Sequence, residues 1–313
     1  MVYLENILKA SMKNLLLSLI LFFIGANIFA QSSVSCFPVE IVSMKGSKIQ
    51  NKITREFDKF GNLLAVSTFQ YYSENPVVSS VRNEYNSKNQ LVKTTNYFAG
   101  KLVSEVSHQI DELGNQLSFS SIDNNGKTIQ TSNIINGEKT INNFDEKGAI
   151  SSVEKIKFYN NKKSIVSKYN AKNILISEEK YVYNPEGLLI TNENSDILAG
   201  VKMTSKTIYN SIKSPEIIEE FVNDKFVTSV KILYNSAGKI LKRTKLDSKN
   251  NEEYRIEYQY ADGKEIEEIS FYRNELVGKK TKTYDEKNNV IKETLTDKIG
   301  QIILETFYKY SCQ

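Results

Sequence analysis

The stretch Tyr234-Asn-Ser-Ala-Gly-Lys-Ile240 returns as Tyr260-Ala-Asp-Gly-Lys-Glu-Ile266 and as Tyr284-Asp-Glu-Lys-Asn-Asn-Val290. Each copy has an aromatic residue, a polar turn rich in Asp, Asn and Gly, and a return to apolar residues. Asp or Asn opens such a turn because its side chain bonds the backbone two residues on, and Gly follows where the chain needs a positive φ. The unit therefore predicts a β-hairpin.

The same unit recurs along most of the chain, with a period of about 25 residues. Its other copies begin at Phe57, Tyr85, Ile110, Ile122, Phe144, Tyr169, Tyr183 and Tyr209. Shorter turns at Tyr97, Phe221 and Tyr272 follow the preceding copy by 12 residues. Such regular spacing of short strands indicates an antiparallel meander. We expect an all-β fold over residues 53–313, a repetitive antiparallel β-hairpin meander forming an extended, twisted or spiralled sheet. Residues 31–52 form a lead-in.

Two details of the repeat predict local geometry. Asn89 and Asn173 take the place of Gly in their turns, and Asn tolerates the left-handed conformation better than most other residues do. Ile256, Tyr258 and Tyr260 alternate with polar residues, which predicts a strand with these three on one face.

The repeat resembles two known families. Tyr284-Asp285 and Phe57-Asp-Lys-Phe-Gly-Asn are similar to the tyrosine–aspartate (YD) units of RHS-repeat proteins. Tyr97-Phe-Ala-Gly-Lys-Leu and Phe221-Val-Asn-Asp-Lys-Phe are similar to the MORN-type hairpin repeats of bacterial exported proteins. This chain departs from the YD pattern where Asn replaces Asp and where Gly is missing. The resemblance implies an exported, twisted or spiralled sheet of hairpins, and it implies no chemistry.

An apolar segment near the N-terminus predicts export. It runs from Leu15 to Ile28, follows Lys13, and ends close to Ala30, a small residue that suits a signal peptidase. The segment is shorter than the roughly 20 residues that span a bilayer. We predict a signal peptide at 1–30, with Met12 as an alternative start, and no transmembrane segment after cleavage. The mature protein is then periplasmic, outer-membrane-associated or secreted.

The charge pattern argues against nucleic acid as a partner. The sequence has 41 basic and 37 acidic residues, and both signs are interspersed without the basic block that a phosphate backbone attracts.

Cys36 and Cys312 lie near the two ends of the chain, and export permits a disulfide between them. Two free thiols are an alternative. Lipidation of Cys36 is a third, although Ser33 stands where a lipoprotein signal has an aliphatic residue.

Residues that could carry catalysis are few. One histidine, His108, excludes a multi-histidine metal site and leaves one base for a catalytic triad. Acid pairs stand at 178–179, 219–220, 252–253 and 267–268, but neighbours on a strand point to opposite faces and cannot converge by themselves. Asp123-Asn124-Asn125-Gly126 lacks the spacing of an EF-hand and predicts a turn. We expect no cofactor, no metal and no enzymatic activity.

Five tyrosines recur at similar places in the hairpins, and they are Tyr209, Tyr234, Tyr258, Tyr260 and Tyr284. One interpretation is a stacking platform for sugar rings or peptide. The other is a ladder of cross-strand aromatic contacts that holds the strand register, at roughly 0.2–1 kcal/mol for each pair.

The sequence therefore favours an exported, non-catalytic β-repeat protein that acts as a binding or scaffold module of the bacterial cell envelope. An envelope glycan or protein would be its partner. Two alternatives stay open, a carboxylate-based polysaccharide hydrolase and an immunity or chaperone partner of a secreted toxin.

Overall fold

A computed structural model describes residues 36–312, apart from 73–74, 111–115, 124–125, 136–137 and 146. The predicted signal peptide lies outside the described residues. Within them, no helix has the length and apolar character needed to cross a membrane.

The described chain is built from 22 strands. They are β1 (Cys36–Lys45), β2 (Lys48–Phe57), β3 (Leu63–Gln70), β4 (Val77–Tyr85), β5 (Leu91–Phe98), β6 (Lys101–Ile110), β7 (Gln116–Asp123), β8 (Gly126–Ile135), β9 (Glu138–Phe144), β10 (Ile150–Tyr159), β11 (Lys162–Asn170), β12 (Leu175–Tyr183), β13 (Leu189–Asp196), β14 (Val201–Tyr209), β15 (Pro215–Val222), β16 (Lys225–Tyr234), β17 (Ile240–Leu246), β18 (Glu252–Ala261), β19 (Lys264–Tyr272), β20 (Glu275–Tyr284), β21 (Val290–Asp297) and β22 (Ile302–Cys312).

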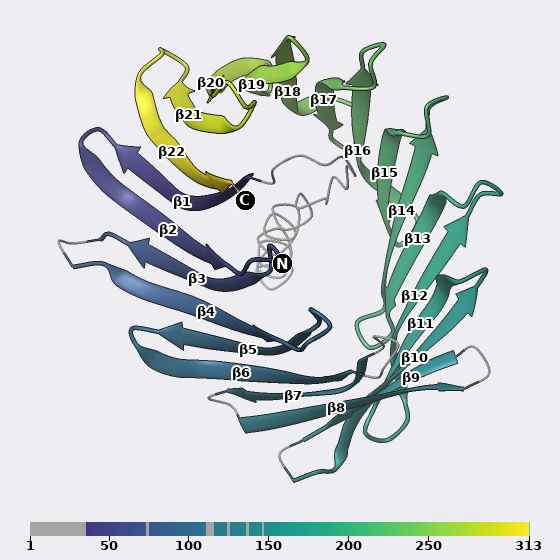
Figure 1. Ribbon diagram of the computed structural model, residues 1–313. Coiled ribbons are helices and arrows are strands. Elements are labelled where there is room, and N and C mark those ends of the chain that lie inside the picture. The colour runs from purple at the N-terminus through teal and green to yellow at the C-terminus, as the bar shows by residue number, and fades with distance from the viewer. Residues whose placement is uncertain are drawn as a thin grey trace. The chain divides into compact units, whose positions relative to one another are not determined.

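The strands form one antiparallel meander that closes on itself (Figure 1). Each strand pairs with the next, as β18 does with β19 and β19 with β20. In addition β22 pairs with β1, and the hydroxyls of Ser43 and Thr306 lie 3.1 Å apart across this seam. The predicted hairpin meander is confirmed, but the prediction of an extended, twisted or spiralled sheet is wrong. Closure pairs the backbone groups of both outer strands, which an open sheet would leave without partners.

The sheet begins earlier than the repeat in the sequence suggested. Strand β1 and the first residues of β2 occupy the predicted lead-in. Cys36 and Cys312, the two cysteines of the sequence, are both disulfide-bonded in the structure.

Most of the longer turns share one hydrogen-bonding pattern. An opening Asp or Asn bonds through its backbone N–H to the carbonyl four residues on, and its own carbonyl accepts the N–H three residues on. The side-chain oxygen accepts further backbone N–H groups, as Asn235 Oδ1 does from Ala237 and Lys239. The opening residues of these turns are Asp58, Asn86, Asp145, Asn170, Asn184, Asn210, Asn235, Asp247, Asp285 and Asp297.

The fourth residue of each such turn has a positive φ, as the repeat predicted. Asn89 and Asn173 both have a φ of 59°, so the predicted left-handed conformation is confirmed. The turns predicted after Tyr97, Phe221 and Tyr272 are two-residue loops in which both residues have positive φ. That combination is the type I′ geometry, whose twist matches the twist of the paired strands.

The recurring tyrosines fasten the strand ends. The register shifts directly before Tyr209, Tyr234 and Tyr284, because the following strand has one extra residue there, a β-bulge. The hydroxyl then donates a hydrogen bond to a carbonyl at the start of the preceding strand. Tyr234 bonds the Pro215 carbonyl at 2.8 Å and Tyr284 bonds the Glu265 carbonyl at 2.7 Å. Each bond contributes about 1 kcal/mol.

Little apolar surface is fully buried in the described chain. Its buried apolar residues are Ile156, Ile232 and Leu246. Because both faces of a single-layer sheet stay partly exposed, stability rests on strand pairing, turns and contacts between side chains of neighbouring strands.

Candidate functional site

Strand register assigns side chains to the two faces of the sheet, because residues paired across antiparallel strands share a face. Lys280 pairs with Glu268, which pairs with Tyr258, and Lys282 pairs with Glu293. We call the face that carries these residues the tyrosine face. When the strand pairings are followed from β18 around the closed sheet, residues of every described strand can be assigned to this face.

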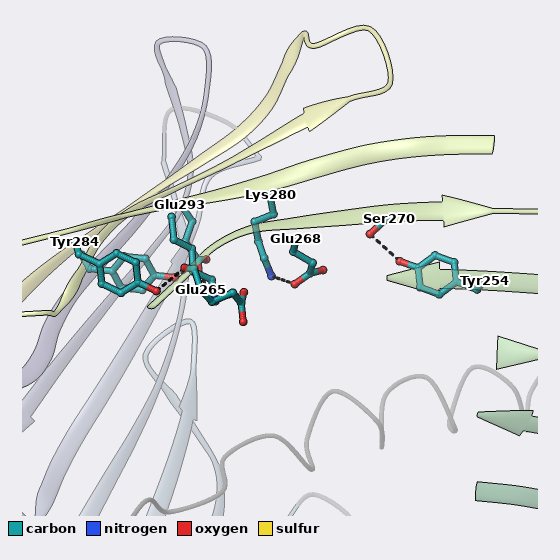
Figure 2. Close-up of polar contacts among 9 residues, drawn as sticks. Tyr254, Glu265, Glu268, Ser270, Lys280, Tyr284 and Glu293 are labelled. Carbon is teal, nitrogen blue, oxygen red and sulfur yellow. Dashed lines mark hydrogen bonds and ion pairs between the residues drawn. The ribbon is translucent and has the colours of Figure 1, made fainter. Parts of the chain in front are cut away.

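Charged residues gather on the tyrosine face of β18 to β22, which we call the charged part. Lys280 Nζ lies 2.8 Å from a carboxylate oxygen of Glu268. Lys282 Nζ lies 2.7 Å from Glu265 and 4.0 Å from Glu293. Figure 2 shows Glu265, Glu268, Lys280 and Glu293 on the same side of their strands. The ion pairs therefore link successive strands rather than residues within one strand.

Tyrosine hydroxyls extend this cluster. Tyr308 donates a hydrogen bond of 2.9 Å to Glu293. The Tyr254 and Ser270 hydroxyls lie 3.1 Å apart (Figure 2). Burial, followed by the nearby charge of Glu293, raises the pKa of Tyr308. Tyr308 and Tyr254 thus add hydroxyl groups at both ends of the row of ion pairs.

Tyr258 lies within the charged part. Burial is the main cause that raises its pKa to about 12, and the Glu268 carboxylate adds to the effect while Arg243 opposes it. For Lys280, burial alone would lower the pKa, but the hydrogen bond and charge of Glu268 outweigh burial and the pKa is raised. Lys280 therefore stays cationic and Tyr258 stays neutral across the physiological range.

Most side chains on the tyrosine face of β4 to β10 are neutral, with Lys139 and Glu154 as exceptions, and we call this region the amide part. Gln130 Nε2 donates to Asn143 Oδ1 at 2.7 Å, and Asn143 Nδ2 donates to Ser152 Oγ at 3.0 Å. Asn83 accepts from Thr94 at 3.0 Å. The amide part thus links neighbouring strands through neutral hydrogen bonds, where the charged part uses ion pairs.

The five predicted tyrosines occupy two kinds of position. Tyr209, Tyr234, Tyr260 and Tyr284 lie at strand ends, and each hydroxyl is bonded to a backbone carbonyl. Tyr258 lies inside its strand beside the charged residues. The strand containing Ile256, Tyr258 and Tyr260 places these three on one face, as the alternation predicted.

The other candidates remain apart. His108 pairs with Phe119, with ring centroids 6.2 Å apart, in the amide part of the face. Glu267 and Glu268 reach different lysines, Lys279 and Lys280, so the adjacent acids diverge as predicted. The predicted turn at 123–126 includes positions outside the described residues.

Sequence reasoning missed Glu265, Lys282 and Glu293 as members of one cluster. They lie on three successive strands, β19, β20 and β21, and register brings them together. Counting in steps of two from Tyr258 reaches Glu268, Lys280 and Lys282 but misses Glu265 and Glu293, because bulges and turns shift the count by one residue.

The cluster has limited means for catalysis. Since both glutamates approach the same ammonium group, the Glu265 and Glu293 carboxylates lie within about 7 Å of each other, in the range used by glycoside hydrolases. However, Lys282 stands between them and compensates both charges. No group of metal-binding side chains occurs among the residues described.

Comparisons with known proteins give no family. No protein-family model matches the sequence, and no curated protein matches it. The resemblance to YD and MORN repeats therefore rests on the turn motifs alone.

Several solved structures share a likeness in fold. The TcdB2-TccC3 structure is 11% identical over 78% of this chain, with a TM-score of 0.36, and the match spans 17% of that chain. A porin-like protein from Bacteroides uniformis is 10% identical over 79% of this chain and 96% of its own, with a TM-score of 0.34. A porin-like protein from Bacteroides vulgatus is 8% identical over 88% of this chain and 99% of its own, with a TM-score of 0.23. These values are too low to transfer any function to this chain.

Proposed function

We propose that the chain is an exported, non-catalytic binding module of the bacterial cell envelope, and that the charged part of the tyrosine face binds its ligand. One observation carries this proposal. The amide part links its strands with neutral side chains, so the fold does not require charges on this face, yet β18 to β22 concentrate them around Tyr258 and Tyr308.

The chemistry of the charged part suits a glycan that carries charged groups. Aromatic side chains offer an apolar surface with a polar tip, which suits a sugar ring and its hydroxyls. The ammonium groups of Lys280 and Lys282 and the three nearby carboxylates offer partners for both signs of charge. A closed sheet presents no free strand edge, so a partner must bind through side chains or turns rather than by adding a strand.

A screen against immobilised neutral and charged polysaccharides and against envelope proteins tests the proposal. We expect binding to charged glycans, weakened at high salt and unaccompanied by cleavage. Equal binding to neutral glycans would refute a role for the charges.

Hydrolysis of a polysaccharide is a second candidate function, favoured by the convergence of Glu265 and Glu293. It requires release of reducing ends by the purified protein, abolished by Glu293→Gln. Binding without release of reducing ends by the wild-type protein would exclude it.

A further inference from the structure

A groove of about 500 Å³ opens at one end of the sheet, between the turns that begin at Asn184 and Asn210. Leu188, Ile190 and Ile208 line it together with Tyr209. Its polar lining residues are Asn184, Glu186, Thr207, Asn210, Ser211 and Lys213. The volume lies in the range of small-ligand sites, and the lining combines apolar and polar side chains. The groove belongs to the turns and does not depend on the charged part of the tyrosine face.

A lysine side chain covers several strand-end tyrosines, but no lysine of the described residues covers Tyr209. At Tyr183, Tyr260 and Tyr284 a lysine ammonium lies 5.1, 5.4 and 5.5 Å from the ring centroid. In each case the tyrosine hydroxyl donates a hydrogen bond to a backbone carbonyl, and the lysine directly precedes the residue with that carbonyl. The three lysines are Lys162, Lys239 and Lys264.

Leucine occupies this position in the Tyr209 hairpin. The Tyr209 hydroxyl bonds the Leu189 carbonyl at 2.9 Å, so the matching position is Leu188. Leucine lacks the long charged side chain that lies over the rings of Tyr183, Tyr260 and Tyr284. The Tyr209 ring and its apolar neighbours therefore remain accessible in the groove.

Lys213 adds an independent sign of function. It has a φ of 61° at the turn position where the other turns of this pattern have Gly or Asn. A left-handed conformation is costly for a residue such as lysine, and strain of this kind gathers at functional sites. Lys213 forms no ion pair with any residue that the structure describes, so its ammonium group is available to a ligand.

The two walls of the groove carry opposite charges. Lys213 lies in one turn, and Glu186, whose carboxylate accepts a hydrogen bond of 3.1 Å from Asn184, lies in the other. The two turns are two strand spacings apart, or roughly 10 Å, which matches the length of an extended tripeptide. We infer that the groove binds a short apolar peptide with free termini, its carboxylate at Lys213 and its ammonium group at Glu186.

Calorimetric titration with trileucine tests this inference, with N-acetyl-trileucine and trileucine amide as matched ligands. The wild-type protein binds the free peptide, and each cap weakens binding about fivefold, the upper range for one exposed ion pair. Lys213→Asn weakens binding of the free peptide and makes binding indifferent to the C-terminal amide. Glu186→Gln makes it indifferent to the N-terminal acetyl group.

The repeat itself supplies the decisive control. Leu188→Lys restores the arrangement found at Tyr260 and abolishes binding. Asn62→Lys makes the same change beside Tyr85, in a turn that does not line the groove, and leaves binding intact. Lys213→Asn relieves backbone strain, so its melting temperature stays level or rises and unfolding cannot explain lost affinity. Equal binding of free and capped peptides, or wild-type affinity in Leu188→Lys, would overturn the inference.

Discussion

The amide part and the charged part of the tyrosine face are built on the same hairpin, yet they differ in chemistry. In β4 to β10, Asn143 joins its neighbours through neutral hydrogen bonds. In β18 to β22, Lys282 occupies an equivalent cross-strand position between two glutamates. The turns and strand-end tyrosines are common to both regions. The difference teaches that backbone and turns specify the scaffold, while residues on the face can vary to suit a ligand.

Removing the positive charge of Lys282 should lower the free energy of unfolding more than any other change considered. Lys282→Met leaves Glu265 and Glu293 close together without a cation, and we expect a loss of about 2 kcal/mol in the free energy of unfolding, below the range for a fully buried pair. Urea unfolding measures it. Lys282→Arg, which keeps the charge, should retain most of the stability. A loss below about 0.5 kcal/mol would mean that the ion pairs are as weak as ordinary surface pairs.

The matched change in the amide part should cost less and respond differently to salt. Asn143→Ala removes two side-chain hydrogen bonds, and we expect a loss of about 1–2 kcal/mol. Its cost should be the same in 0.05 and 1 M NaCl, whereas the cost of Lys282→Met should shrink at high salt because ions screen the interaction. Parallel urea titrations at both salt concentrations decide this. The same salt response in both variants would remove the distinction between the two parts.

The tyrosine hydroxyls should show what the two regions share. Tyr85→Phe beside the amide part and Tyr260→Phe beside the charged part each remove one bond to a strand-end carbonyl. We expect each to cost about 1 kcal/mol, measured by thermal or urea unfolding. A marked difference between the two variants would show that the scaffold is not the same in both regions.

Alkaline pH should lower the stability that the protein gains from the neutral Tyr258 side chain. The pKa of Tyr258 is raised from 10.0 to about 12 in the folded protein, so the unfolded chain ionises first. The stabilisation is complete below pH 10 and is lost as pH rises to 12. Tyr258→Phe should flatten the fall in stability between pH 10 and 12. If wild type and variant lose stability in parallel over this pH window, burial does not raise the pKa of Tyr258 as described.

Much of the scaffold could be predicted from sequence because its signals are local. The Asx-opened turns, the left-handed Asn89 and Asn173, and the two-residue loops each depend on a few adjacent residues. The turns at Asp247 and Asp297 have the same geometry but lack the preceding aromatic residue. The sequence repeat therefore did not predict them.

Closure could not be predicted because it depends on pairing between distant strands, and the charged part could not because it depends on the exact register of neighbouring strands. Nothing local shows that β22 meets β1. Bulges such as the one between Gln259 and Tyr260 shift the register by one residue, and each shift changes which side chains share a face. Therefore Glu265, Lys282 and Glu293 could not be aligned before the bulges were located.

The most direct test of the account makes the charged part resemble the amide part. Glu268→Gln combined with Lys280→Gln replaces one ion pair by two neutral amides and should preserve the fold. We predict that wild-type protein and Asn143→Ala bind a charged polysaccharide with similar affinity, while the double variant binds at least tenfold more weakly in the same titration. Wild-type affinity in the double variant would contradict the claim that this part of the tyrosine face binds the ligand.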